Sequence, residues 1–183
     1  ISVKKSSCNF LLKKINNKYF KSKSSIENLA FAYKIVKNLK ISDKVIIKGL
    51  NKFKGLPHRQ EIIFSNKNFL CINDSKATSF DACLQSLSNY NNIYWIVGGL
   101  SKYGDNFNLK NVKKKIIKAY VIGKNISFFT KQIKKNILYT ISGNLQNAVN
   151  SIYQDIKFNR NLQSTILLSP AAASFDQFDN FEN

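Results

Sequence analysis

The sequence has no methionine, one histidine and three cysteines. The single histidine, His58, has no second imidazole with which to build a typical zinc site, and the spacing offers no Cys–His or Ser–His–Asp set. Cys8, Cys71 and Cys83 are odd in number and form no motif, which predicts buried thiols in a reducing cytoplasm rather than a disulfide framework. We therefore expect no metal site and no nucleophilic catalytic group in this chain.

Long apolar runs are also missing. No stretch approaches the roughly 20 apolar residues that a membrane span needs, and the start lacks the apolar segment of a signal peptide. We therefore expect a cytoplasmic protein. No GxxxxGK[ST] phosphate-binding loop occurs, since "GKN" at 123–125 lacks the leading glycine and the hydroxyl. If the protein uses ATP, its triphosphate must therefore be bound elsewhere. The absent methionine and the end in "FDNFEN" predict an excised piece of a longer protein.

Acidic residues are few: 10 Asp and Glu stand against 29 Lys and Arg, a formal net charge of +19. Such an excess would fit a protein that binds nucleic acid or a membrane surface. Only Arg59 and Arg160 are arginines, however, and arginine is the residue that nucleic-acid readers use for bidentate contacts. Lysines spread among many Asn and Ile residues favour compositional drift, so we expect neither nucleic acid nor membrane as a partner.

The first part of the chain has a helical pattern. Residues 1–23 are short, basic and weakly patterned, and we expect edge strands there. The stretch 24–39 places Ile26, Leu29, Ala30, Tyr33 and Val36 on one helical face, and a second helix is expected over 42–53. The turn-rich stretch 54–60 then contains Gly55 and Pro57, which end the helical pattern.

From residue 60 onward, short apolar strands alternate with helices. The expected strands are 61–64, 69–72, 93–99, 119–123, 137–140 and 164–170, and the expected helices are 79–90, 109–118, 126–135 and 144–156. This alternation predicts an α/β fold with a mostly parallel, Rossmann-like sheet flanked by helices. We place a domain boundary near residue 55, so that the segments are 1–55 and 56–183.

Polar residues follow three of the expected strands, in "NDSKAT" (73–78), "GGLSKYGD" (98–105) and "SPAAASFDQF" (169–178). Ligands of parallel sheets bind beyond the carboxyl ends of the strands, so we expect these three loops to meet at one edge. Thr78 lies where a helix begins, and its hydroxyl could cap that helix or help to bind an anion there. Asp74 suits sugar hydroxyls, whereas Lys102 could bind an anion or be a solvated surface charge. Ser174 could cap a following helix or contact a ligand.

Four motifs, "GLPHRQE", "NDSKATS", "GGLSK" and "LLSPAAASFDQFDNFE", occur in the order and spacing of one family. They resemble the Mur ligases, and among these the branch that adds D-glutamate during peptidoglycan synthesis. The resemblance runs from about residue 20 to the end. It implies that 1–55 is the end of a central ATPase domain and that 56–183 is most of the C-terminal, glutamate-binding domain.

The resemblance implies an ATP-dependent, amide-forming ligase with a role in cell-wall formation and cell division. Its substrates would be UDP-N-acetylmuramoyl-L-alanine, D-glutamate and ATP, with Mg²⁺ bound mainly by a domain outside this chain. The acceptor carboxylate would become an acyl phosphate, which the amine of D-glutamate attacks. We expect a monomer, and we expect this piece to be inactive alone because it contains no catalytic residue that the family pattern identifies.

The family pattern also assigns residues. Thr78, Lys102, Ser174, Phe175 and Phe181 would bind D-glutamate. The nucleotide would be bound by Asn28, His58, Arg59 and Asp74, with Ser75 and Lys76 behind them. At the helix that contains Asn28 the family shows an HNxxN-like pattern, whose first two positions here are Ser24 and Ser25. The alternatives are a degenerate ligase, or a stand-alone basic binding module on a Rossmann-like scaffold.

Overall fold

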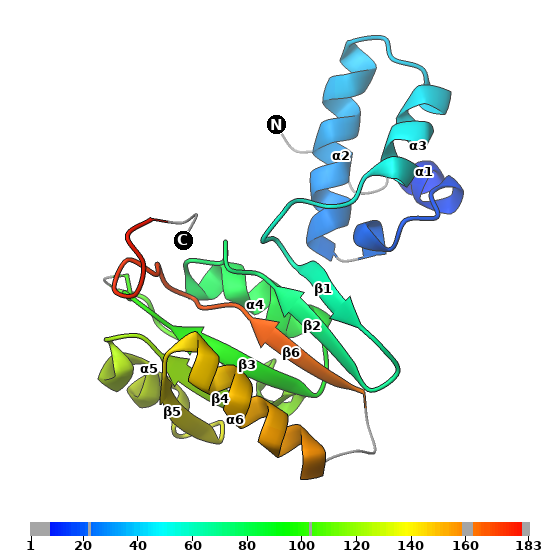
Figure 1. The fold of residues 1–183 in the computed structure, drawn as a ribbon. Coiled ribbons are helices and arrows are strands. Elements are labelled where there is room, and N and C mark those ends of the chain that lie inside the picture. Colours follow the sequence, from blue (N-terminus) through cyan, green and yellow to red (C-terminus); the bar gives the residue numbers. More distant parts are fainter. Residues whose placement is uncertain (1–7, 22, 103, 159–162, 181–183) are drawn as a thin grey trace. The chain divides into compact units, whose positions relative to one another are not determined.

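The computed structural model divides the chain into two compact units, Ile1–Gly55 and Leu56–Asn183 (Figure 1). The residues that the structure describes are 8–21, 23–102, 104–158 and 163–180. Each unit has a hydrophobic core of its own. The assignment of these units to a central and a C-terminal ligase domain stays a prediction.

The first unit is built from helices: α1 (Asn9–Lys14), the 3-10 helix η2 (Lys18–Lys21), α2 (Lys23–Asn38) and α3 (Asp43–Lys52). The apolar face predicted for α2 is confirmed, because its residues pack into the core of this unit. The edge strands predicted before residue 23 are wrong for the described residues. Cys8 and Leu11 are both fully buried there. A helical turn brings residues three apart to one face, whereas a strand would point them to opposite faces.

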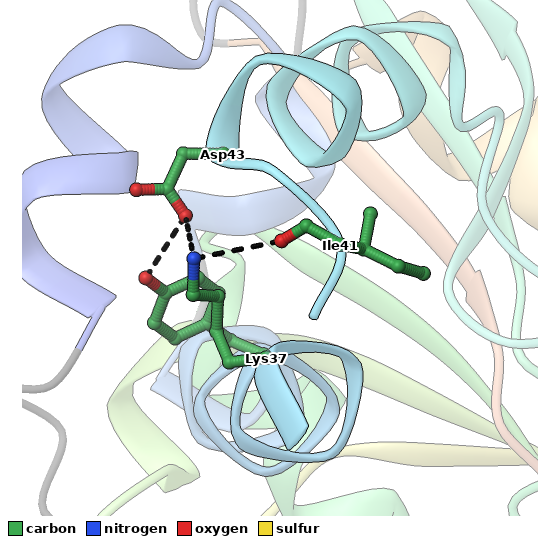
Figure 2. A network of polar contacts seen from close by, with 4 residues as sticks. Lys37, Ile41 and Asp43 are labelled. Atoms are coloured by element: carbon green, nitrogen blue, oxygen red, sulfur yellow. Dashed lines mark hydrogen bonds and ion pairs between the residues drawn. The ribbon is translucent and has the colours of Figure 1, made fainter. Parts of the chain in front are cut away.

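A small polar network joins the end of α2 to the start of α3 (Figure 2). The Lys37 ammonium donates to Asp43 Oδ1 at 3.0 Å and to the carbonyl oxygen of Ile41 at 3.5 Å. The Tyr33 hydroxyl donates to the same carboxylate oxygen at 3.1 Å. The hydrogen bond from Lys37 holds the pKa of Asp43 below its usual range. Asp43 also lies in the first turn of α3, where the helix dipole favours a negative charge.

The second unit is a six-stranded sheet with helices on both faces (Figure 1). Its strands are β1 (Glu61–Ser65), β2 (Phe69–Asn73), β3 (Ile93–Gly98), β4 (Ile116–Ile122), β5 (Tyr139–Gly143) and β6 (Ser164–Leu168). Its helices are α4 (Phe80–Asn89), η3 (Lys113–Lys115), α5 (Ile126–Ile133) and α6 (Leu145–Phe158). The strand order is β1-β2-β6-β3-β4-β5, in which β1 pairs antiparallel with β2 and the other pairs are parallel. The predicted fold class is therefore confirmed.

The two faces of the sheet use alternate residues of the same strands. On β3, Trp95 and Val97 pack into the core that contains α4 and α5, whereas Tyr94 and Ile96 pack into the core that contains α6. Successive side chains of a strand point to opposite faces, so a strand covered by helices on both sides must be apolar throughout. This explains why every residue of β3 is buried.

The helix predicted over 109–118 is wrong. Leu109, Val112 and Ile116 are buried at helix-like spacing, but only the short η3 forms between them. Ile116 instead begins β4 and pairs with Ile93 of β3. Pairing with the central strand of the sheet supplies backbone hydrogen bonds to residues 116–122, and this outweighs the local helical pattern.

Candidate functional site at the carboxyl edge of the sheet

Three polar loops follow three strands that lie side by side and run parallel, β2, β6 and β3. We call them the β2 loop (73–78), the β6 loop (169–178) and the β3 loop (98–105). Asp74 N donates to the carbonyl oxygen of Leu168 at 2.8 Å, and Gly98 N donates to that of Pro170 at 3.0 Å. The prediction that these loops meet at one edge of the sheet is confirmed.

The β3 and β6 loops touch through their backbones. Leu100 and Ala173 form an antiparallel bridge. Leu100 N donates to the carbonyl oxygen of Ala173 at 2.8 Å, and Ala173 N donates to that of Leu100 at 3.3 Å. Gly99 makes this approach possible: its φ is +131°, and a Cβ there would collide with the backbone oxygen of Ala173. The absence of a side chain at Gly99 is therefore a requirement of the contact between the loops.

The β3 loop also reaches the start of α4. Ser79 caps this helix, since its hydroxyl accepts from Ala82 N at 3.4 Å, which leaves Thr78 outside the cap. Asp105 Oδ2 accepts from Phe80 N at 3.3 Å, and Asp105 N donates to the carbonyl oxygen of Lys102 at 3.3 Å. A carboxylate at a helix N-terminus is favourable because free N–H groups and the positive end of the dipole lie there. This hydrogen bond joins the loop that contains Lys102 to the residues next to Thr78.

Asp74 is buried among the loops at the carboxyl edge of the sheet. Its side chain is buried, with 6% exposure, and its carboxylate accepts three hydrogen bonds. The Ser86 hydroxyl donates at 2.5 Å and the Ser169 hydroxyl at 2.9 Å to Oδ2, while Gln60 N donates at 3.1 Å to Oδ1. Burial raises the pKa of Asp74, although these hydrogen bonds and the nearby positive charge of Arg59 favour the ionised form.

A fourth segment, the hinge loop (56–60), lies against the β2 loop. Lys76 N donates to the carbonyl oxygen of His58 at 3.1 Å. The Asn73 amide nitrogen lies 2.9 Å from His58 Nδ1, which must accept because an amide NH₂ only donates. His58 and Gln60 have φ values of +61° and +49°, a left-handed conformation that is unfavourable for residues with a Cβ. The contacts to the β2 loop compensate this strain.

The structure brings together some of the residues that the sequence predicted. Thr78, Lys102 and Ser174 lie on three loops that are joined by the hydrogen bonds above. Lys102 and Phe175 are exposed, and Phe181 lies outside the described residues. Their contacts with D-glutamate stay predictions.

The predicted nucleotide residues fall into both units. His58 and Asp74 make the hydrogen bonds within the second unit that are given above. Arg59 is exposed, and Ser75 N donates to Asn73 Oδ1 at 3.1 Å. Asn28 is exposed on α2 of the first unit. The surroundings of Asp74 differ from the expectation that it binds sugar hydroxyls, because its carboxylate oxygens accept hydrogen bonds from donors within the protein. A contact between Asp74 and a sugar stays a prediction.

Sequence reasoning missed residues that hold this edge together, above all Ser86, Ser169 and Asp105. Ser86 had a detectable signal: it lies on the apolar face of α4, three residues after Cys83, and a hydroxyl on a buried face needs a partner. Ser169 and Asp105 had no local signal, since their partners lie 95 and 25 residues away in the sequence.

The described part of the chain contains no cluster of three His, Cys, Asp or Glu side chains that could bind a metal ion. Among the same described residues, no helix combines the length and the hydropathy that crossing a membrane requires.

Curated relatives are similar to most of this chain. A UDP-N-acetylmuramoylalanine–D-glutamate ligase from Wolbachia sp. subsp. Brugia malayi (strain TRS) is 39% identical over 159 residues, which are 87% of this chain and 32% of the relative. The ligase of the same name from Rickettsia felis is 36% identical over 166 residues (91% and 37%). The one from Rhizobium meliloti (strain 1021) is 40% identical over 156 residues (85% and 34%). The resemblance to the D-glutamate-adding Mur ligases is confirmed.

This similarity covers nearly the whole chain but only 32–37% of the length of these Mur ligases. No family model matches the chain. A solved structure of a murein peptide ligase from Psychrobacter arcticus 273-4 covers 86% of this chain and 37% of its own, with a TM-score of 0.48 and 14% identity. That likeness is too low to support an argument about the site.

Proposed function

We propose that this chain is the D-glutamate-binding part of an ATP-dependent ligase that joins D-glutamate to UDP-N-acetylmuramoyl-L-alanine. In such a reaction the acceptor carboxylate becomes an acyl phosphate, the amine of D-glutamate attacks its carbonyl carbon, and phosphate leaves. The observation that carries this proposal is the meeting of the β2, β3 and β6 loops at one edge of the sheet, in a chain similar to ligases of that name.

The loops offer complementary groups for an amino acid with two carboxylates. In the proposal, the Thr78 hydroxyl and the Lys102 ammonium bind the side-chain carboxylate. Ser174 and the backbone N–H of Phe175 bind the α-carboxylate, with Phe181 beside it. Two carboxylates held at a fixed separation by separate loops define the orientation of the molecule, and this brings the amine to one place only. Orientation of this kind is the contribution to catalysis that we assign to this chain.

The nucleotide is proposed to lie on the side of the hinge loop, where Arg59 supplies a positive charge to a phosphate and His58 lines the edge. Ser75 and Lys76 would support the β2 loop from behind. A sugar hydroxyl would be bound by Asp74 as a fourth donor, beside its three internal hydrogen bonds. A carboxylate offers about four acceptor positions, so one remains.

Lys102 provides the test. In the complete gene product, Lys102→Ala should raise the KM for D-glutamate by about tenfold or more, because a hydrogen-bonded charge pair is lost, while the KM for ATP changes little. Lys110→Ala is the matched control: Lys110 is an exposed lysine in the same connection between β3 and β4. An unchanged KM for D-glutamate in Lys102→Ala would contradict the assignment. A wild-type protein that shows no D-glutamate-dependent phosphate release would contradict the function itself.

A further inference from the structure

We propose that Asp74 is a positioning residue, whose carboxylate holds the hinge loop, the β2 loop and the β6 loop in one arrangement and thereby sets the places of Thr78 and Ser174. The consequence for D-glutamate rests on the proposed function. The arrangement of the loops does not depend on it.

The donors to Asp74 come from three separate segments. Gln60 N belongs to the hinge loop, Ser86 to α4 and Ser169 to the start of the β6 loop. Asp74 itself lies in the β2 loop, and its own N–H donates to the carbonyl oxygen of Leu168. Asp74 is therefore hydrogen-bonded to the hinge loop, to α4 and to the end of β6 with its following loop.

Burial makes these bonds strong determinants of structure. Ser86 and Ser169 have 0% and Asp74 has 6% of their surface exposed, so water does not readily replace a lost partner. Hydrogen bonds to a charged acceptor are roughly twice as strong as bonds between neutral groups. A buried hydroxyl left without its acceptor is penalised further. The segments consequently keep their positions only while the carboxylate is present.

The backbone transmits the position of Ser169 to Ser174. Between them, Pro170 O accepts from Gly98 N at 3.0 Å, Ala171 has a φ of +56°, and Ala173 forms the bridge with Leu100. A five-residue path with these restraints leaves little freedom, so a shift at Ser169 becomes a shift at Ser174.

The path from Asp74 to Thr78 is equally short. Ala77 N donates to the carbonyl oxygen of Asp74 at 2.9 Å, and Thr78 N donates to that of Lys76 at 3.0 Å. The proposed function assigns Thr78 and Ser174 to opposite ends of D-glutamate. The positions of both residues thus depend on the same carboxylate, that of Asp74. A change in that carboxylate alters the separation of the two substrate contacts.

The test uses serine variants, which contact neither the proposed nucleotide nor D-glutamate. The complete gene product is prepared as wild type, Ser86→Ala, Ser169→Ala and Asp74→Asn, with Ser88→Ala as the matched control. Ser88 lies on the same helix as Ser86, is exposed, and donates to Leu84 O rather than to Asp74. We expect Ser86→Ala and Ser169→Ala to raise the KM for D-glutamate by about tenfold with a smaller change in kcat, and Ser88→Ala to match wild type.

Hydrogen exchange gives a readout that needs no activity. In Ser86→Ala, amides of the hinge loop and of the β6 loop should exchange about tenfold faster, while those of β4 and β5 keep their protection. If both loops keep wild-type exchange, the proposal is overturned, whether or not the protein is a ligase.

Two kinetic outcomes would also overturn it. One is a lower melting temperature in both serine variants with the KM for D-glutamate within twofold of wild type, which means that the bonds only stabilise the fold. The other is a raised KM for ATP in Asp74→Asn with normal serine variants, which means that Asp74 acts by contacting the nucleotide. A wild-type protein without D-glutamate-dependent turnover contradicts the proposed function alone, and the exchange experiment then decides the positioning role.

Discussion

Asp74 and Asp155 both lie in the second unit and both accept hydrogen bonds from two side chains, but their donors differ in charge. Asp74, at the carboxyl edge of the sheet, is surrounded by two hydroxyls and a backbone N–H. Asp155 lies on α6, where the Lys118 ammonium donates at 2.7 Å and the Tyr120 hydroxyl at 2.5 Å. Its side chain is about one-third exposed, at 34%, whereas Asp74 is buried.

The pKa values of these two carboxyls move in opposite directions. Burial raises the pKa of Asp74, because its neutral donors do not offset the loss of water. Partial burial also acts on Asp155, but the hydrogen bonds from Lys118 and Tyr120 outweigh it and lower its pKa. Burial, followed by the hydrogen bond to Asp155, raises the pKa of Tyr120, because its ionised form would lose water and face a negative charge. The comparison teaches that the number of hydrogen bonds does not decide the preferred charge of a carboxyl. A cation in contact and access to water decide it.

The largest expected difference between the two sites is in stability. Asp74→Ala should lower the free energy of unfolding by about 3 kcal/mol, because two buried hydroxyls and one N–H lose their acceptor together. Urea denaturation followed by the fluorescence of Trp95, the one tryptophan of this chain, measures it. Asp81→Ala, at an exposed position of α4, is the control and should change stability by about 0.5 kcal/mol or less. A loss below about 1 kcal/mol for Asp74→Ala would show that water replaces the carboxylate.

Asp155→Ala should have a smaller effect, a loss of about 1 kcal/mol, because a partly exposed ion pair contributes little and only the Tyr120 hydroxyl loses a protected partner. The same denaturation experiment measures this loss. Lys118→Ala is a useful companion, since it removes the cation and leaves the tyrosine bond. The comparison breaks if Asp155→Ala destabilises the chain as much as Asp74→Ala does.

The free energy of unfolding should depend on pH with opposite signs at Asp74 and at Asp155. The lowered pKa of Asp155 means that its contribution to stability is present above the ordinary pKa of about 3.9 and is lost as the pH falls through the lowered value. The raised pKa of Asp74 means that the part of its contribution that comes from titration is fully present below about 3.9 and is lost as the pH rises through the raised value, while the hydrogen bonds that its carboxylate accepts remain.

Asp155→Asn and Asp74→Asn remove each titration separately. From pH 6 down to pH 3, the stability difference between wild type and Asp155→Asn should shrink, and that between wild type and Asp74→Asn should grow. Urea denaturation at constant ionic strength over this range measures both. Slopes of the same sign would show that the two carboxyls do not differ as described.

The smallest expected effect is that of salt. Raising NaCl from about 0.1 M to 1 M shortens the screening length from about 10 Å to 3 Å, so the contribution of the Asp155–Lys118 pair should fall by a few tenths of a kcal/mol. Asp74 has no ammonium or guanidinium in hydrogen-bond contact among the described residues, and only the exposed Arg59 acts on it through charge, so its contribution should change less than that of the Asp155–Lys118 pair. The stability of wild type against each Asn variant at the two salt concentrations measures the difference.

Most of the fold could be predicted from periodicity, and the two failures have a common cause. The helix 42–53 and the strands of the sheet have a clear hydrophobic pattern and form at or near the predicted residues, although β4 begins three residues earlier than expected and β5 ends three residues later. Residues 8–21 and 109–118 are lysine-rich and interleave apolar with charged positions, so the local pattern did not decide their structure. In both segments the outcome was decided by packing: Leu11 packs into the core of the first unit, and Ile116 pairs with β3.

The candidate site was predictable in outline, because polar residues directly after apolar strands indicate one edge of a parallel sheet. That reasoning correctly grouped the loops that contain Thr78, Lys102 and Ser174. It could not predict what Asp74 contacts, since Ser86 and Ser169 are 12 and 95 residues away in the sequence. An acid in a polar loop looks exposed from the sequence alone, and only the packing of α4 and β6 against the β2 loop buries it.

The sequence by itself determined the alternation of strands and helices, the chemistry of the three loops and the resemblance to the Mur ligases, because each depends on residues that are close together in the chain. The tertiary structure decided which donors meet each carboxylate, which loops touch, and whether an aspartate gains or loses affinity for its proton. Those properties depend on burial and on distances between segments far apart in the sequence. Asp74 and Asp155 are the same amino acid, and their opposite behaviour comes entirely from the neighbours that folding supplies.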